Sequence, residues 1–171
     1  MGLDIMFYET DNQNYVKEFI DYLDYLDKDW NAEFAYGEEL CYFRKKNCLV
    51  SWAERTVGID KDCVVSNAID KSNIETLLKT IDDILILIPQ DDLKKIEAGC
   101  RTYEDYPYLD GLPKEVVEKA VETFPTTSGC FFGSTCYDTT YIWQLKEIKE
   151  QFTEVIKKMK PTKYYHLVFS W

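Results

Sequence analysis

Two segments with alternating apolar side chains stand at opposite ends of the chain, and they constrain the fold more than any other feature. In residues 3–8, Leu3, Ile5 and Phe7 alternate with more polar neighbours, and residues 162–171 (TKYYHLVFSW) alternate in the same way up to the last residue. A period of two is typical of a β-strand with one buried face. Each strand is too short of partners to be stable alone, so we expect the two ends to pair in one sheet.

Between these ends, apolar residues recur at helical spacing and predict five to six helices. Ser72 is the expected N-cap of the third helix, Gly58 and Gly99 are expected C-cap residues, and Pro113 is expected at the first position of the fifth helix. A short strand is expected near 63–65, and residues 102–112 are expected to form an exposed loop. The helices are expected over residues 11–29, 38–56, 72–88, 91–98, 113–124 and 138–160.

The length of 171 residues and the 46% of apolar residues indicate one folded unit with a real core. We therefore predict an α+β fold: a helix-rich single domain over residues 1–171, with about five to six helices packed on a small sheet that pairs the N- and C-terminal strands.

The net charge of -11 is confined to two blocks of the chain. Residues 1–37 hold nine acids against two bases, and residues 58–112 hold twelve against six, whereas the remaining segments are close to neutral. Such a surface repels the phosphates of nucleic acids, so the sequence disfavours duplex binding. Arg44, Lys45 and Lys46 are the only three consecutive bases; they are expected to attract any bound anion, unless they simply form a solvated turn.

Several other classes of protein are disfavoured. The chain has no basic and apolar leader and no stretch of about 20 apolar residues, so we expect a cytoplasmic protein that does not enter a membrane. Six cysteines without a C-x-x-C pair, together with a single histidine, His166, give no zinc-binding pattern, so we expect no metal and no cofactor. The cysteines fit a cytoplasmic protein if they are reduced, and the sequence does not decide their redox state. There is no nucleophile elbow and no paired-carboxylate motif, which favours binding over catalysis.

The helix expected over 38–56 carries one polar stripe in an otherwise apolar wheel. Arg44, Asn47, Ser51 and Arg55 follow one another at positions i, i+3, i+7 and i+11. The stripe is a candidate anion-binding surface.

Residues 126–138 (TTSGCFFGSTCYD) are the most unusual segment of the chain. Gly129 and Gly133 permit tight turns and the close approach of a partner, and five hydroxyl side chains precede the last helix. No phosphate-binding motif is present. Two interpretations stay open, an inner strand or tight structural turn, and a segment that contacts a ligand.

Four segments of the chain, taken together and in order, form a further pattern. MGLDIMFYE (1–9), CYFRKKNCLVSW (41–52), TTSGCFFGSTCYD (126–138) and YYHLVFSW (164–171) resemble, in the same order, a family of small uncharacterised proteins found mainly in bacteriophages and prophages. Its members often begin Met-Gly-Leu-Asp and end in an aromatic strand with Ser-Trp. This chain departs by having Phe43 where Trp is usual and Cys130 where a Phe is usual. The resemblance implies a phage or mobile-element origin and an accessory role such as blocking host immunity.

The leading functional hypothesis is an anti-defence inhibitor that engages a basic surface of a host defence protein. Opposite charges would steer such an association, although acidity also serves solubility alone. The candidate partner-binding residues are Asp21, Asp24, Asp27, Glu104 and Asp105.

The alternative hypothesis is a sponge for a small phosphorylated nucleotide signal, bound where the polar stripe meets residues 126–138. Aromatic rings would stack on the base and cationic side chains would pair with phosphate. The candidate ligand-binding residues are Tyr42, Arg44, Lys45, Asn47, Arg55, Thr127, Ser128, Phe132, Ser134, Thr135 and Tyr137. A catalytic Cys–His pair with His166 is a third and weaker hypothesis.

Overall fold

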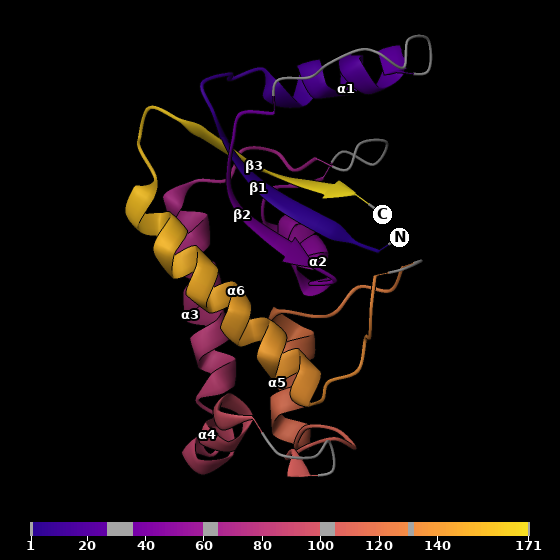
Figure 1. Cartoon of the computed structure of the whole chain (residues 1–171), viewed down its shortest axis with the longest axis vertical. Helices are drawn as coiled ribbons and strands as arrows, with labels where there is room; N and C mark the ends of the chain where they lie inside the picture. Colours follow the sequence, from indigo (N-terminus) through magenta and orange to yellow (C-terminus); the bar gives the residue numbers. More distant parts are fainter. Residues whose placement is uncertain (1, 27–35, 60–64, 100–104, 130–131, 171) are drawn as a thin grey trace.

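A three-stranded antiparallel sheet brings the two ends of the chain together (Figure 1). The computed structural model describes residues 2–26, 36–59, 65–99, 105–129 and 132–170. Strand β1 (Asp4–Thr10) lies between β2 (Glu38–Arg44) and β3 (Tyr164–Ser170). Asp4 is opposite Ser170 and Thr10 is opposite Tyr164, so the expected pairing of the terminal strands is confirmed over their full length.

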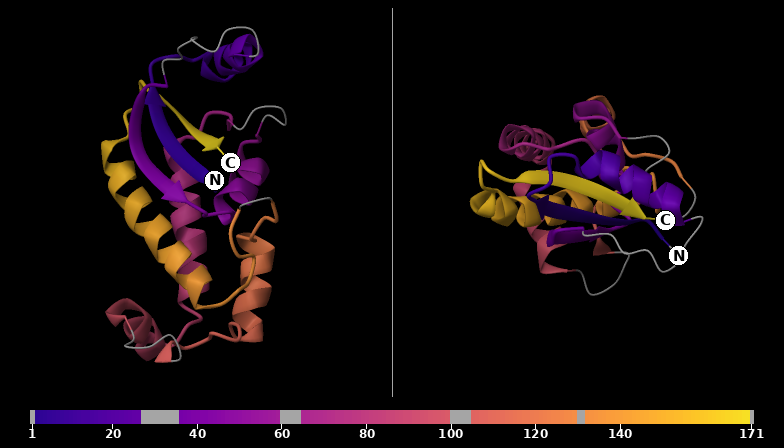
Figure 2. Two further views of the ribbon diagram at one scale, coloured as in Figure 1. Left: turned by 45° about the vertical axis from the view of Figure 1, so that its right-hand side comes forward. Right: turned by 90° about the horizontal axis from the view of Figure 1, so that it is seen from above.

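Within these residues the chain also forms six helices, which confirms the α+β fold. The long helix α6 crosses one face of the sheet and packs along α3, whereas α1 lies on the opposite side of the sheet (Figures 1 and 2). No helix in this part of the chain combines the length and apolar character needed to cross a membrane. The helices are α1 (Tyr15–Leu26), α2 (Cys48–Thr56), α3 (Lys71–Leu85), α4 (Gln90–Ala98), α5 (Lys114–Thr123) and α6 (Thr139–Lys158).

The prediction of a single helix over 38–56 is wrong. Residues Glu38–Arg44 form β2, and only Cys48–Thr56 are helical. Between them Lys45 adopts a left-handed backbone conformation with φ of 58°, which ends the strand. The segment is apolar at both helical and strand spacing, and pairing with β1 decides between them because it buries Phe43 against α6.

Helix boundaries differ from the expectation at several further places. Asp70, rather than Ser72, caps α3: its side chain accepts from the backbone N–H of Asn73 in a capping box, and the Ser72 hydroxyl donates to the same carboxylate. Pro113 is the N-cap of α5 rather than its first residue. Helix α3 ends at Leu85 instead of continuing to 88, and α1 begins at Tyr15 rather than at 11. Of the short strand expected near 63–65, only Val65 is described, and it forms an isolated bridge with Val168.

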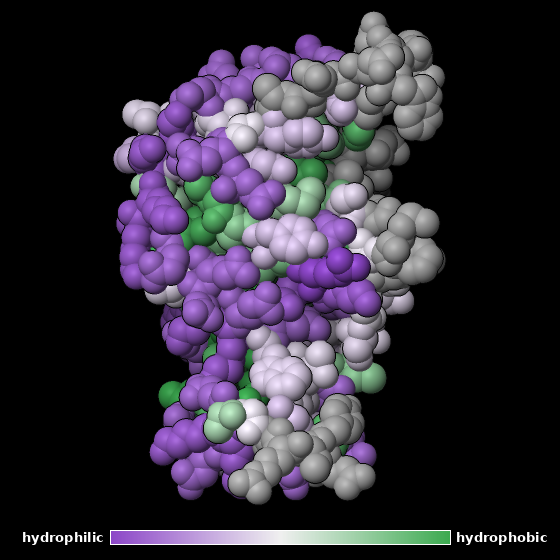
Figure 3. Space-filling model, in the orientation of Figure 1, coloured by the Kyte–Doolittle hydropathy of each residue, from purple (hydrophilic) through white to green (hydrophobic). Residues whose placement is uncertain are grey.

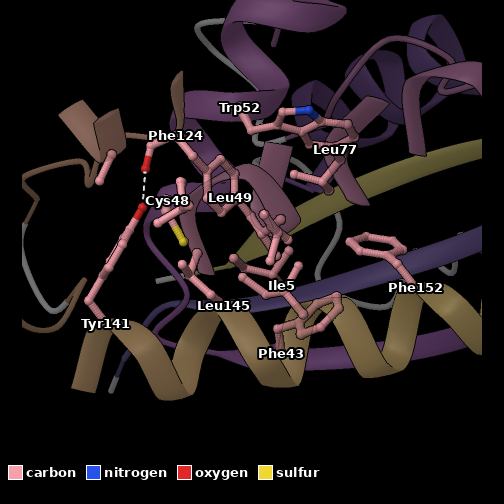
Figure 4. Packing of buried hydrophobic residues seen from close by; sticks show 14 of the residues in the cluster. Ile5, Phe43, Cys48, Leu49, Trp52, Leu77, Phe124, Tyr141, Leu145 and Phe152 are labelled. Atoms are coloured by element: carbon pink, nitrogen blue, oxygen red, sulfur yellow. Dashed lines mark hydrogen bonds between the residues drawn. The ribbon is translucent and has the colours of Figure 1, made fainter. Parts of the chain in front are cut away.

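The main core lies between the sheet and helices α2, α3, α4, α5 and α6. Phe152 of α6 is at its centre, with its ring centroid 5.3 Å from those of Phe7 and Phe43 and 6.4 Å from that of Trp52 (Figure 4). At the other end of α6, the buried hydroxyl of Tyr141 donates to the Phe124 carbonyl over 2.7 Å. The apolar cluster as a whole joins three strands and five helices, α2 to α6.

A second, smaller cluster lies on the other face of the sheet, under α1. Tyr15 and Phe19 are buried there against Val65 and Val168. The Tyr15 ring stacks on His166 of β3, with centroids 4.7 Å apart. Helix α1 thus covers the sheet with aromatic side chains and turns Asp21 outward into solvent.

Candidate functional site

The three consecutive bases lie at the end of β2 (Arg44) and in the turn that leads to α2 (Lys45 and Lys46). The backbone N–H of Lys45 donates to the Leu3 carbonyl over 2.7 Å and so holds the turn beside β1. Lys46 forms an ion pair of 2.6 Å with Glu147 of α6. Arg44 and Lys45 are exposed, and Gly2 packs against both side chains, since a Cβ built there would lie 3.4 Å from Lys45 Cε. We call Arg44–Asn47 the basic turn.

The polar stripe expected along one helix does not exist, because a strand, a turn and a helix share these residues. Ser51 is buried in α2. Arg55 lies at the end of α2, where its guanidinium donates to the Glu122 carbonyl of α5 over 3.3 Å. Tyr42 is on β2, and its hydroxyl donates to the Asp4 carboxylate. Arg55 and Tyr42 therefore lie on different elements and do not share one helix face.

Asn47 connects the basic turn to the segment 126–137. Its side chain is fully buried, and Nδ2 donates to the carbonyls of Ser134 (2.9 Å) and Phe132 (3.4 Å). A buried amide with two backbone acceptors stabilises the loop that it binds. Residues near Arg44 were predicted to lie beside residues 126–138. They do so through the buried side-chain amide of Asn47.

The described residues of 126–137 form no strand, and they close a loop through their own polar groups. The Thr126 hydroxyl donates to the Thr135 carbonyl over 3.1 Å, and the Thr126 N–H donates to the Tyr137 hydroxyl over 3.1 Å. The Ser134 hydroxyl accepts from the Cys136 N–H. Thr127 is half-buried and Ser128 is exposed. The hydroxyls of Thr126 and Ser134 and the Tyr137 phenol thus have a partner within the loop.

The two glycines of this loop allow close approach inside the chain. The Phe132 ring occupies the space beside Gly129, where a Cβ would lie 2.6 Å from the ring atoms. Gly133 has φ of +97°, and a Cβ there would lie 3.2 Å from Lys45 Cβ. Phe132 itself is buried in the main core. The partners that these glycines approach are therefore residues of the same protein.

The candidate partner-binding acids lie in different regions. Asp21 is exposed in the middle of α1, and Asp24 belongs to the same helix. Asp105 is exposed at the start of the loop that precedes α5. Asp27 and Glu104 lie outside the described residues.

A cluster of acids that the sequence analysis missed lies where β1, α1 and β2 meet. We call it the acidic hollow. It has a volume of about 470 Å³ and combines four carboxylates with one lysine. Its lining residues are Glu9, Thr10, Asp11, Asn12, Glu18, Gly37, Glu38 and Lys163. The acids at the end of β1 and at the start of β2 could have indicated this cluster. The sequence pattern would first have had to identify residues 38–44 as a strand.

Hydrogen bonds and ion pairs order this hollow. Lys163 Nζ lies 2.7 Å from Asp11 and 3.8 Å from Glu9. Glu9 is buried; it accepts from the Tyr165 hydroxyl over 3.0 Å and lies 3.5 Å from Lys160 Nζ. The hydrogen bond to Asp11 and the nearby charges of Glu9 and Glu38 raise the pKa of Lys163. The hollow therefore remains negative overall, because two lysines, Lys160 and Lys163, face four carboxylates.

Three groups have potential reactivity: the thiols of Cys41, which is half-buried, and Cys48, which is buried, and the buried imidazole of His166. Burial raises the pKa of the Cys41 and Cys48 thiols to about 12 in each case, which keeps them in the unreactive thiol form at neutral pH. Burial also lowers the pKa of His166, whose Nδ1 lies 3.0 Å from the Ser66 carbonyl. Its position under α1 is that of a packed strand residue.

Two further hollows are present, and the smaller of them shares Lys163 with the acidic hollow. One of about 630 Å³ separates α3 and α4 from α6, and one of about 530 Å³ lies between the start of α3 and residues 159–165. Among the described residues, no group of three or more His, Cys, Asp or Glu side chains has the arrangement of a metal site. Comparison of the chain with protein-family models, curated proteins and solved structures finds no match.

Proposed function

We propose that this protein acts by binding, as an anti-defence inhibitor of phage or mobile-element origin that engages a basic surface of a host immune protein. The observation that carries the proposal is the acidic hollow with the adjoining outer face of α1. Four carboxylates line the hollow together with one lysine, and Asp21 extends the negative surface along the helix. Such a surface complements the cationic clefts with which nucleic-acid-handling proteins hold phosphates.

The acidic surface is supported on a folded base. Asn12 donates to Glu18 Oε2 over 2.6 Å, and the Thr10 hydroxyl accepts from the Asn12 N–H over 3.1 Å. These bonds hold the start of α1 against the end of β1, so the carboxylates are ordered before a partner arrives. Preorganisation lowers the entropic cost of association.

A plaque assay tests the proposal. The protein is expressed in host strains that each carry one defence system, and restored plaque formation identifies the target. The double variant Glu18→Lys and Asp21→Lys is expected to lose protection, and binding to the purified target is expected to weaken as salt rises. The matched control is Glu75→Lys with Glu115→Lys, which makes the same change in net charge at exposed positions of α3 and α5.

Equal loss of protection in both double variants would assign the effect to net charge and contradict the proposal. Full protection by the Glu18 and Asp21 variant would remove the acidic surface from the mechanism.

A second candidate function is the binding of a small phosphorylated nucleotide at the basic turn. The contact between Lys45 and Gly133 favours it, since it places two exposed cations beside the loop 126–137. Arg44→Ala is expected to abolish any increase in melting temperature that a nucleotide produces, while the melting temperature without ligand stays the same. No increase with a panel of nucleotides, or an increase that Arg44→Ala retains, would contradict it.

A further inference from the structure

The two outer edges of the sheet differ in what covers them. Along β3, Ser66 donates its N–H to the Leu167 carbonyl and accepts from the Leu167 N–H through its hydroxyl, each over 2.9 Å. Ile69 donates to the Tyr165 carbonyl over 2.8 Å. Residues 65–69 thus close this edge. No described strand pairs with the outer edge of β2, which lies along the outside of the sheet (Figure 2).

The hydrogen-bonding groups at the open edge can be assigned from the register. Lys45 bonds to Leu3, and Phe43 and Cys41 are opposite Ile5 and Phe7. In an antiparallel pair, alternate residues bond to the partner strand and those between them face away. Tyr42 and Arg44 therefore direct their backbone N–H and carbonyl groups outward. The Tyr42 carbonyl accepts one side-chain bond, from Gln151 over 3.3 Å.

The charges along β2 are arranged for pairing with a copy of itself. Glu38 and Glu39 stand at the beginning of the strand, and Arg44 and Lys45 stand at its end. Two such strands in antiparallel orientation bring the acids of each copy alongside the bases of the other. Tyr42, at the centre, is 41% exposed and would face Tyr42 of the second copy. Figure 3 shows hydrophobic side chains at the surface at the level of the sheet, between more hydrophilic regions.

From this edge we propose that two copies of the chain associate by antiparallel pairing of β2 with β2. The product is a six-stranded sheet in the order β3-β1-β2-β2-β1-β3. Because residues 65–69 already close the edge of β3, the assembly ends at two copies and does not extend into a fibre.

The regular part of the edge is short. The register shifts between Phe7 and Tyr8, which leaves Leu40 as an extra residue in β2, and the left-handed Lys45 ends the strand. About four residues of each copy pair regularly, and each copy carries a net charge of -11. The dimer is therefore expected to be weak and to depend on the complementary charges.

Sedimentation velocity from about 5 to about 500 µM is expected to reveal a concentration-dependent dimer. Glu39→Arg alone and Arg44→Glu alone each oppose like charges in their own homodimers, so each is expected to weaken dimerisation at least about tenfold. An equimolar mixture of the two variants restores both complementary contacts and is expected to dimerise again. Circular dichroism and melting temperature confirm that each variant is folded.

Amide hydrogen exchange checks the interface directly. Exchange at Tyr42 and Arg44 is expected to slow at high protein concentration, whereas exchange at Leu167, on the closed edge, stays the same. A wild-type monomer at all concentrations overturns the proposal, and so does a dimer that neither variant weakens or a mixture that does not recover. If the Tyr42 amide is protected from exchange only when another protein is added, the edge of β2 binds that partner instead. This result would also overturn the proposal.

Discussion

The two faces of the sheet are built from different kinds of contact. The face toward α6 is packed by apolar rings, with Phe152 in contact distance of Phe7 and Phe43. The face toward α1 is covered by a smaller cluster in which polar aromatic groups, Tyr15 and His166, stack on one another. The first face supplies most of the apolar burial. The second joins the sheet to the acidic surface, so the candidate partner-binding residues of α1 depend on the less extensive of the two clusters.

The largest expected effect is that of Phe152→Ala. The substitution leaves a cavity among the sheet, α2 and α6, because Trp52 and Phe43 pack on the same ring. We expect the free energy of unfolding to fall by about 3–5 kcal/mol. Denaturant unfolding followed by far-ultraviolet circular dichroism measures it. A loss of less than about 1 kcal/mol would contradict the central place of this ring.

Phe19→Ala tests the other face. Phe19 is buried under α1 near Tyr15 and Tyr36, whose ring centroids lie 6.1 and 5.8 Å away. Half-buried neighbours can move into the vacated space, so we expect a smaller loss of about 1–3 kcal/mol. Amide exchange should accelerate in α1 and remain slow in α6. Uniform acceleration in both helices would mean that the two faces unfold as one unit.

His166 is expected to give the α1 face its own pH dependence. Burial lowers the pKa of His166 in the folded protein below 6.5, so the unfolded chain binds the proton more readily. The free energy of unfolding should therefore be constant above about pH 7 and fall below pH 6.5, with a slope of up to about 1.4 kcal/mol per pH unit. Equilibrium unfolding between about pH 5.5 and 7.5 measures the slope.

His166→Phe keeps an aromatic ring against Tyr15 and removes the titrating group. Its stability should change less with pH than that of the wild type over the same range. An identical slope in both proteins would assign the pH dependence to other groups.

The smallest expected effect concerns the cap of α3, on the α6 side. Asp70→Ala removes the acceptor of the Asn73 N–H and is expected to cost about 1 kcal/mol. Ser72→Ala removes only a bond to Asp70 and should cost a few tenths as much. Thermal unfolding of both variants compares them. A larger effect at Ser72 would restore that residue as the cap.

Local pattern alone predicted much of this fold. The alternation at both ends identified β1 and β3 and their pairing, and helical spacing located α1, α3, α4, α5 and α6 to within a few residues. Asp138, at the expected start of the last helix, caps α6 by accepting from the N–H groups of Thr140 and Tyr141. Apart from the pairing of β1 with β3, these features depend on residues that are close together in the sequence, so the sequence alone reveals them.

The candidate sites were harder to predict. Contact between the basic turn and residues 126–138 was expected and is present, but Asn47 makes it as a buried amide, whereas Arg55 binds α5 instead. The acidic hollow was missed because its acids come from 9–18 and 38, which meet only once β2 pairs with β1.

The sequence by itself determined which residues are buried, namely those of the alternating ends and of the apolar helix faces. It also determined which stay in solvent, such as the acids Glu18 and Asp21 of α1. Only the tertiary structure decided that 38–44 is a strand, that the described residues of 126–137 bond to one another, and that one edge of the sheet is covered while no described strand pairs with the other. The reason is physical. Periodicity reports which face of a segment is apolar, but the hydrogen-bond partners of a strand or loop come from residues distant in the chain, and those partners select the conformation.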